Sequence, residues 1–275
     1  MANPANSIEL PLVDISNSHD VIAGKKLLDA AVKFGFLYVD SNSTRFTASD
    51  VDQAFNLNRG WVGMHVETLD PEHHDIDEDF FTTRHDQSKG STENSLRWLY
   101  YPAVVSSYRP GKDIRAGAHS DYGSITLLFQ RPGQPGLEIL TADNQWAAVP
   151  VYPGGQANFP FPPILVNIGD LLSYWTDGLL KSTVHRVVFP ENAQSDHISK
   201  PQDRYSIAFF CQPVSETELV PVPSEIVSCH RKDTKGDEET ERVIGHGGGA
   251  RGWDDGQRRI TAGQHLQSRL AATYI

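Results

Sequence analysis

The stretch that decides the fold is AGAHSDYGSITLLF, residues 116–129, in which His119 and Asp121 precede a β-branched and apolar run. Side chains alternate between the two faces of a strand, so residues two positions apart point the same way. We therefore expect His119 and Asp121 to project from one face of one strand, about 7 Å apart at Cα. That separation suits an imidazole and a carboxylate that bind one metal ion.

A third candidate ligand, His185, lies in another β-patterned run, STVHRVVF, residues 182–189. Two histidines and one carboxylate bind one face of Fe(II) and leave three coordination positions open for other ligands. This donor set favours Fe(II) over a metal that prefers thiolates. The alternative is that His185 is an ordinary core histidine that binds no metal.

The chain contains a second His-x-Asp motif, formed by His73 and Asp75. It lies in PEHHDIDEDF, residues 71–80, where acidic residues dominate and no strand pattern is present. A calcium loop is not indicated, because the glycine and the terminal glutamate that such a loop requires are missing. We interpret this motif as a solvated acidic loop, so the metal prediction depends on His119 and Asp121.

Two polar residues, Arg204 and Ser206, interrupt a later apolar run, RYSIAFF, residues 204–210. Alternation places both on one face of the predicted strand. A guanidinium inside an apolar strand is costly without an anionic partner, and the neighbouring sequence offers no obvious carboxylate. The carboxylate of a small molecule would supply the partner, since guanidinium binds carboxylate through two parallel hydrogen bonds. The alternative is an edge-strand arginine that reaches solvent.

Short β-rich runs follow one another from Leu96 onward, separated by turn sequences such as RPG, QPG and WTDG. This pattern predicts an antiparallel sandwich or barrel. The predicted strands cover residues 96–102, 124–129, 137–140, 147–151, 164–169, 171–175, 182–189 and 204–210.

The sequence before this region predicts a small α/β portion. Its expected elements are a strand at 7–13, an amphipathic helix in DVIAGKKLLDAAVKFG and a strand at 36–39, followed by irregular chain over 57–95. In the helix, Val21, Leu28 and Val32 form one apolar stripe, and Gly35 ends it. A further helix is predicted at the end of the chain, in TAGQHLQSRLAATYI.

Together these segments resemble the Fe(II)/2-oxoglutarate-dependent dioxygenases of the isopenicillin N synthase-like group. The order His-x-Asp, His and Arg-x-Ser matches the family, as do the segments LYYP and LVNIGDLLSYWTDGLLKSTVHRVV. The closing ITAGQHLQSRLAATY is similar to fungal members in particular. The resemblance implies a mainly β fold with flanking helices around a double-stranded β-helix, or jelly roll.

The resemblance also implies roles for six residues. Three of them are the metal ligands: His119, Asp121 and His185. By the same resemblance, Arg204 and Ser206 hold the distal carboxylate of 2-oxoglutarate. Tyr101, in LYYP, matches a family tyrosine that approaches this carboxylate, unless it is only a packed strand residue.

The implied reaction uses Fe(II), 2-oxoglutarate and O₂ to hydroxylate, desaturate or cyclise a small organic metabolite in secondary metabolism. An iron oxidase of the same fold that needs no 2-oxoglutarate is one alternative. The other is a catalytically impaired jelly-roll binding protein.

We expect one domain over residues 1–275. It would comprise a shortened N-terminal α/β portion (1–95), a jelly-roll core (96–215) and a C-terminal extension that ends in a helix (216–275). Only 118 residues precede His119, fewer than the family usually has, and FNLNRGWVG and PEHHDIDEDF resemble joins where helical segments are absent. We therefore expect an uncovered face of the sheet and self-association through it.

The composition makes several classes of partner unfavourable. A net charge of −11 over 275 residues argues against nucleic acid and anionic membrane surfaces. Two cysteines, Cys211 and Cys229, suit a reducing compartment. No apolar run approaches the roughly 18 residues of a membrane span, and the first residues lack a secretory pattern. We expect a cytoplasmic protein whose partner is a small-molecule substrate.

Overall fold

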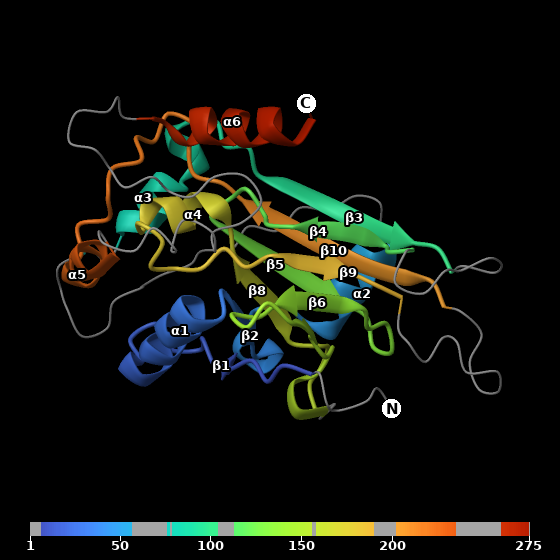
Figure 1. Ribbon diagram of the computed structural model, residues 1–275. Coiled ribbons are helices and arrows are strands. Elements are labelled where there is room, and N and C mark those ends of the chain that lie inside the picture. The colour runs from blue at the N-terminus through green and yellow to red at the C-terminus, as the bar shows by residue number, and fades with distance from the viewer. Residues whose placement is uncertain are drawn as a thin grey trace.

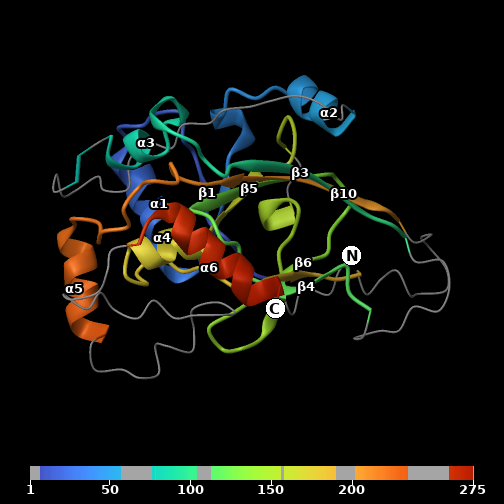
Figure 2. The ribbon, with the colours of Figure 1, turned by 90° about the horizontal axis from the view of Figure 1, so that it is seen from above.

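Two β-sheets pack face to face in the computed structural model, with helices around them (Figures 1 and 2). The structure describes residues 7–56, 76–77, 79–103, 113–155, 158–189, 202–234 and 260–274. Apolar side chains from both sheets meet between them, among them Phe36 and Leu165 from one sheet and Ile139 and Val187 from the other. The prediction of a mainly β jelly-roll fold is confirmed.

The larger sheet has six strands in the order β1-β2-β8-β5-β10-β3, and the smaller has four in the order β4-β9-β6-β7. The six are β1 (Leu12–Val13), β2 (Phe36–Val39), β8 (Ile164–Ile168), β5 (Ile125–Gln130), β10 (Arg204–Cys211) and β3 (Ser95–Tyr101). The four are β4 (Ala116–His119), β9 (His185–Val187), β6 (Leu137–Leu140) and β7 (Trp146–Ala148). All neighbouring strands are antiparallel except β1 and β2.

Helices surround the sheets. The α-helices are α1 (Val21–Lys33), α2 (Ala48–Asn56), α3 (Phe80–Arg84), α4 (Asp170–Trp175), α5 (Glu225–Thr234) and α6 (Ala262–Tyr274). Short 3₁₀ turns are η2 (Ser41–Ser43), η3 (Gln87–Lys89) and η4 (Pro153–Gly155). None of the helices in these described ranges is long and apolar enough to cross a membrane. The prediction of irregular chain over 57–95 is wrong at α3 and at the start of β3.

Helix α1 begins and ends where the sequence indicates. The Asp20 carboxylate caps it by accepting hydrogen bonds from the N–H groups of Ile22 and Ala23. Within the predicted stripe, Leu28 and Val32 pack against the core, whereas Val21 is 43% exposed, so that part of the stripe is wrong. Ala23 and Leu27 carry the apolar contacts of this end of the helix with the six-stranded sheet instead.

Gly35 ends α1 with φ of 65°, in the left-handed region that glycine adopts without strain. A Cβ atom at this position would lie 2.1 Å from the carbonyl oxygen of Lys181 and 2.7 Å from Oγ1 of Thr183. The backbone of Gly35 also accepts a hydrogen bond from the N–H of Ile168 at 2.9 Å. The turn between α1 and β2 is therefore packed directly against the segment that leads into β9.

The run LLSYW, predicted as a strand, forms α4 instead. A short apolar run cannot be assigned by periodicity alone, because buried strands and buried helical turns have the same composition. Here Gly169 occupies the N-cap, and Asp170 follows in the first turn, where a negative charge is favourable. The predicted strand at residues 7–13 is also shorter, because only Leu12–Val13 pairs as a strand and Ser7 makes an isolated bridge to Ala148.

The two faces of the six-stranded sheet have different roles. The inner face meets the smaller sheet, and the outer face packs on α1 and α2 through Leu37, Val166 and their neighbours. Three aromatic residues of this face are partly exposed: Trp98 (37%), whose indole N–H donates to the backbone oxygen of Ala54 in α2, Tyr100 (56%) and Tyr205 (38%). The expected joins at 55–63 and 71–80 lie mostly outside the described residues, and the division of the chain at residues 95 and 215 stays a prediction.

Candidate metal centre and anion pocket

The three predicted metal ligands lie together between the sheets. His119 ends β4 and His185 begins β9, and the two are direct partners in that antiparallel pair. One ligand atom from each of His119, Asp121 and His185 lies within 4.8 Å of the others. The Nε2 atoms of His119 and His185 lie 3.9 and 3.8 Å from Oδ1 of Asp121. This is the spacing of a three-donor metal site.

The placement of His119 and Asp121 on one strand is wrong, because β4 ends at His119 and β5 begins only at Ile125. Asp121 belongs to the turn between these strands. Its carboxylate reaches the histidines because the chain bends there, and not because strand side chains alternate. The second His-x-Asp motif, at His73 and Asp75, lies outside the described residues.

Two polar side chains that the sequence analysis missed hold the Asp121 carboxylate. Oγ1 of Thr126 donates a hydrogen bond to Oδ2 at 2.6 Å, and Nδ2 of Asn167 donates another at 2.7 Å. Oδ1 is left facing the two imidazoles. Burial by itself raises the pKa of Asp121, but His185, the two hydrogen bonds and His119 outweigh it, so the pKa is below its ordinary value. The carboxylate is therefore anionic and offers one oxygen.

Each imidazole is oriented by a backbone carbonyl. Nδ1 of His119 lies 2.7 Å from the oxygen of Gly117, and Nδ1 of His185 lies 3.1 Å from the oxygen of Thr183. A carbonyl oxygen only accepts, so Nδ1 carries the proton and Nε2 keeps its lone pair. Burial lowers the pKa of His185, which favours the neutral form that binds a metal. These features fit a metal ligand better than an ordinary core histidine.

Arg204 is buried on the inner face of the six-stranded sheet and is 1% exposed. Its strand lies between β5 and β3, so the alternative of an edge-strand arginine reaching solvent is wrong. Nη1 donates to Oγ of Ser206 at 3.1 Å, the guanidinium lies 5.4 Å from the ring centroid of Tyr101, and Nε has no partner. Among the residues that the structure describes, no carboxylate pairs with Arg204.

The surroundings of Arg204 are suited to an anion. Burial lowers its pKa to about 10, with Tyr101 opposing this effect and the second cation Arg115 adding to it. Gln130, directly opposite Ser206 in the sheet, is 2% exposed, and neither polar atom of its amide has a partner. Neither Arg115 nor Gln130 was predicted. An anionic group bound here would satisfy polar atoms that the described residues leave unpaired.

The metal triad and the polar residues around Arg204 share one layer of the structure. Paired residues in an antiparallel sheet project to the same face, and the face alternates along each strand. Asn167 pairs with Thr126, which lies four residues before Gln130 on β5, and Gln130 pairs with Ser206 on β10. The side chains that hold Asp121 and those that surround Arg204 therefore line the same interior face.

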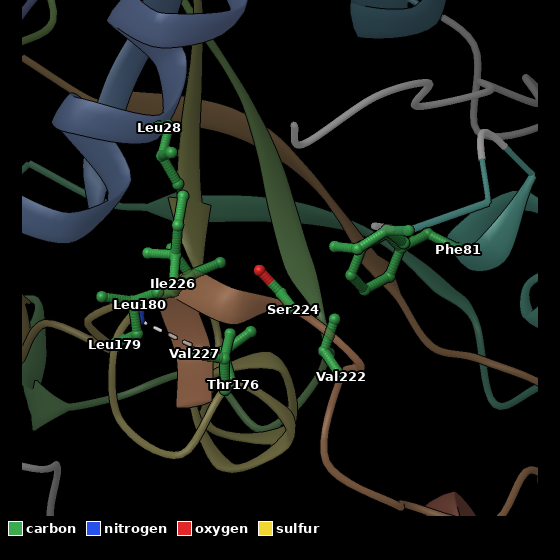
Figure 3. A pocket seen from close by; sticks show the side chains of 10 residues that line it. Leu28, Phe81, Thr176, Leu179, Leu180, Val222, Ser224, Ile226 and Val227 are labelled. Atoms are coloured by element: carbon green, nitrogen blue, oxygen red, sulfur yellow. Dashed lines mark hydrogen bonds between the residues drawn. The ribbon is translucent and has the colours of Figure 1, made fainter. Parts of the chain in front are cut away.

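A separate cavity of about 30 Å³ lies among α1, α5 and the end of α4, and Figure 3 shows its lining. Its walls are mainly aliphatic and aromatic, including Leu28, Phe81, Leu180, Val222 and Val227. None of its lining residues is ionisable. This cavity is a packing feature of the helical side of the molecule, and its lining contains no carboxylate, imidazole or thiol.

Residues 92–213 match the family model described as the 2OG-Fe(II) oxygenase superfamily. UPF0676 protein C1494.01 of Schizosaccharomyces pombe is 29% identical to the chain, over 80% of this chain and 86% of that protein. Validamycin A dioxygenase of Streptomyces hygroscopicus subsp. limoneus is 35% identical over 54% of this chain and 36% of that protein. The chain spans less than half the length of the curated dioxygenases that it matches.

The fold is similar to that of solved structures. A full-length protein of Neurospora crassa, crystallised in complex with alpha-KG, superposes with a TM-score of 0.62 at 23% identity, covering 98% of each chain. This likeness supports the jelly-roll fold. The match of residues 92–213 to the family model supports a relationship of that segment to the 2OG-Fe(II) oxygenase superfamily.

Proposed function

We propose that this chain, in which residues 92–213 are a domain of the 2OG-Fe(II) oxygenase superfamily, is an Fe(II)- and 2-oxoglutarate-dependent dioxygenase acting on a small organic metabolite. The observation that carries the proposal is the pairing of a His-Asp-His triad with a buried arginine on one interior face. The family uses Fe(II), 2-oxoglutarate and O₂, and the donor set of this chain fits that metal.

In this proposal, His119, Asp121 and His185 hold the iron. Because Thr126 and Asn167 occupy Oδ2 of Asp121, the carboxylate supplies a single oxygen, and the other coordination positions stay open. Bound Fe(II) and 2-oxoglutarate together supply a two-electron oxidation of a substrate C–H bond by O₂, with succinate and CO₂ as coproducts. The task of the protein is to orient the reactants and to keep water out.

Arg204 and Ser206 would bind the distal carboxylate of 2-oxoglutarate, with Tyr101 beside them. The guanidinium has a free Nε–H and lies in a buried site, where a charge-assisted pair is strong. The approach of Arg115 adds positive charge for a ligand with two carboxylates. The role of Tyr101 is to pack against the guanidinium and to line the pocket, since its ring is 5.4 Å away.

The prime substrate would approach from the side of His119. The His119 side chain is 46% exposed, whereas those of Asp121 and His185 are 7% and 9% exposed. The open side of the triad is therefore the side on which a substrate can reach the iron. The names of curated relatives, such as validamycin A dioxygenase, support a metabolite of secondary metabolism as the substrate class.

Self-association through the outer face of the sheet is a further part of the proposal. Trp98, Tyr100 and Tyr205 are partly exposed there, and the rings of Tyr100 and Tyr205 stack at 5.0 Å. A cytoplasmic location, and the lack of nucleic-acid and membrane partners, stay predictions from the acidic composition.

The test is an anaerobic titration of the Fe(II) protein with 2-oxoglutarate, followed by the metal-to-ligand charge-transfer absorbance. A band that saturates at one equivalent, and succinate formed on exposure to O₂, support the proposal. Asp121→Ala should lose both iron and band, and His73→Ala, which removes the second His-x-Asp motif, should keep them. If the protein consumes O₂ with a carboxylate substrate but forms neither band nor succinate, the 2-oxoglutarate-independent oxidase replaces the proposal.

A further inference from the structure

A buried carboxylate that is no part of the predicted site, Asp170, lies directly behind the metal ligands. It is 7% exposed and occupies the first turn of α4. Oγ of Ser182 donates to its Oδ1 at 2.6 Å, and Oγ of Ser120 donates to its Oδ2 at 3.1 Å. Nη2 of Arg269, from α6, lies 2.5 Å from the same Oδ2. One carboxylate thus joins four segments of the chain.

Two of these segments carry the metal ligands. Ser120 stands between His119 and Asp121, and the N–H of Asp170 donates to the backbone oxygen of Asp121 at 2.7 Å. Ser182 lies three residues before His185, on the approach to β9. The relative position of the three ligands therefore depends on where the Asp170 carboxylate is held.

Arg269 holds that carboxylate from the far side. It is 7% exposed, and its guanidinium also lies 5.4 Å from the ring centroid of Tyr122, the residue after Asp121. Figures 1 and 2 show one end of α6 next to α4, in agreement with the contacts between the two helices. Helix α6 thereby reaches the turn that follows His119 and contains Asp121.

Stability alone is a weak reason for such a pair. A buried ion pair contributes little more than a well-packed apolar pair of the same volume, because both charges lose their hydration. A buried pair does, however, fix direction and distance better than apolar contacts do, since its hydrogen bonds are oriented. The hydrogen bonds of Ser120 and Ser182 to Asp170 therefore fix the segments that carry the metal ligands relative to this pair.

We propose that Arg269 is a positioning residue for the metal centre: through Asp170 it sets the separation of the His119–Asp121 turn from the His185 strand. This inference rests on the proposed function, because it assumes that the triad binds the metal. Arg269 lies outside residues 92–213, the segment that matches the superfamily. Helix α6 therefore contributes to the geometry of the metal site.

The test uses Co(II) as the probe, because its d–d absorption reports ligand geometry without turnover. Arg269→Met should weaken Co(II) binding by about 10-fold or more, the range known for outer partners of metal ligands, and should change the d–d bands. Arg269→Lys keeps the charge and should fall between Arg269→Met and the parent. The matched control is His265→Leu, which disturbs the packing of α6 on Tyr174 without touching Asp170.

The control should bind Co(II) as the parent does, even if it unfolds at a lower temperature. If Arg269→Met has the parental affinity and spectrum while its melting temperature falls, the pair is merely structural and the inference is overturned. If His265→Leu weakens Co(II) binding as much as Arg269→Met, docking of the helix matters and the ion pair does not. If Arg269→Met fails to fold, the test is made on Arg269→Lys. An Arg269→Lys protein with the Co(II) affinity and d–d spectrum of the parent overturns the inference. A parent that binds no more Co(II) than Asp121→Ala would instead contradict the proposed function itself.

Discussion

Replacement of Arg204 by methionine should have opposite effects on the protein without and with 2-oxoglutarate. Without ligand, the guanidinium is buried and bonded only to Ser206 among the described residues, so its charge is poorly compensated. Methionine fills a similar volume and carries no charge. We therefore expect Arg204→Met to be more stable than the parent when no ligand is present, and to lose its response to 2-oxoglutarate.

The magnitude follows from the burial of the charge. A pKa lowered to about 10 corresponds to roughly 3 kcal/mol of destabilisation of the charged form, at about 1.4 kcal/mol for each factor of ten. Loss of the hydrogen bond to Ser206 offsets about 1.5 kcal/mol of this gain. The net stabilisation is then about 1–2 kcal/mol, or a rise in melting temperature of roughly 2–8 °C for a chain of this size.

The effect on ligand binding has the other sign. Removal of one partner of a buried charge pair costs about 2–5 kcal/mol, which is roughly 30-fold to several thousand-fold in affinity. The assay is thermal unfolding of the Mn(II)-loaded protein with and without 2-oxoglutarate, with Arg204→Lys as the charge-preserving control. The melting temperature of the parent should rise with the logarithm of the 2-oxoglutarate concentration once that concentration exceeds Kd, and the melting temperature of Arg204→Met should stay constant. If Arg204→Met melts below the ligand-free parent, the protein itself supplies a partner for Arg204 and the reasoning is refuted.

Three further outcomes are expected. Asn167→Leu removes one of the two hydrogen-bond donors to Asp121 and should weaken Co(II) binding about 10-fold or more in a Co(II) titration. An unchanged affinity would mean that Thr126 alone orients the carboxylate. Burial, with Arg269 beside it, lowers the pKa of His265 to about 4, so the unfolded chain binds more protons than the native state once the pH falls below about 6.5. The free energy of unfolding is therefore not reduced by His265 above that pH, and it should fall by up to about 3 kcal/mol as the pH is lowered toward 4. In urea unfolding, His265→Phe should lose less stability than the parent over this pH range. An equal loss in both proteins would mean that the imidazole is hydrated. Trp98→Glu should shift a concentrated sample toward the monomer in sedimentation velocity, and a parent that is monomeric at every concentration would remove self-association from the proposal.

Much of the β-structure could be predicted because its strands are short, apolar and separated by turn residues. The runs that became β3, β5, β6, β8 and β10 show this pattern clearly. The run LLSYW could not be assigned in the same way, because it is buried on nearly every side and so has no polar face to reveal its period. Its identity as a helix depends on Gly169 and Asp170 at its start, a weaker signal than the apolar run that follows.

The site was predictable only where function leaves a local pattern. His119, Asp121, Arg204 and Ser206 form two-residue motifs, and His185, in a separate β-patterned run, completes the donor set. The groups that orient these residues leave no such pattern. Asn167 reaches Asp121 over 46 positions, and that contact exists only because β5 and β8 pair in one particular register. Register is set by packing over the whole sheet, so it cannot be obtained from a motif.

The close approach at Gly35 has a consequence for any attempt to transfer this metal site to another protein. Thr183 donates from Oγ1 to the oxygen of Phe34 at 2.7 Å, and its own carbonyl oxygen orients His185. A protein that received only residues 92–213 would lack the oxygen of Phe34 that accepts the hydrogen bond from Thr183. It would also lack Gly35, against which the segment of Lys181 and Thr183 packs. The smallest segment that could be transferred with its metal site intact is therefore longer than residues 92–213. Substitutions at position 35 are expected to alter the position of His185 and so the metal site.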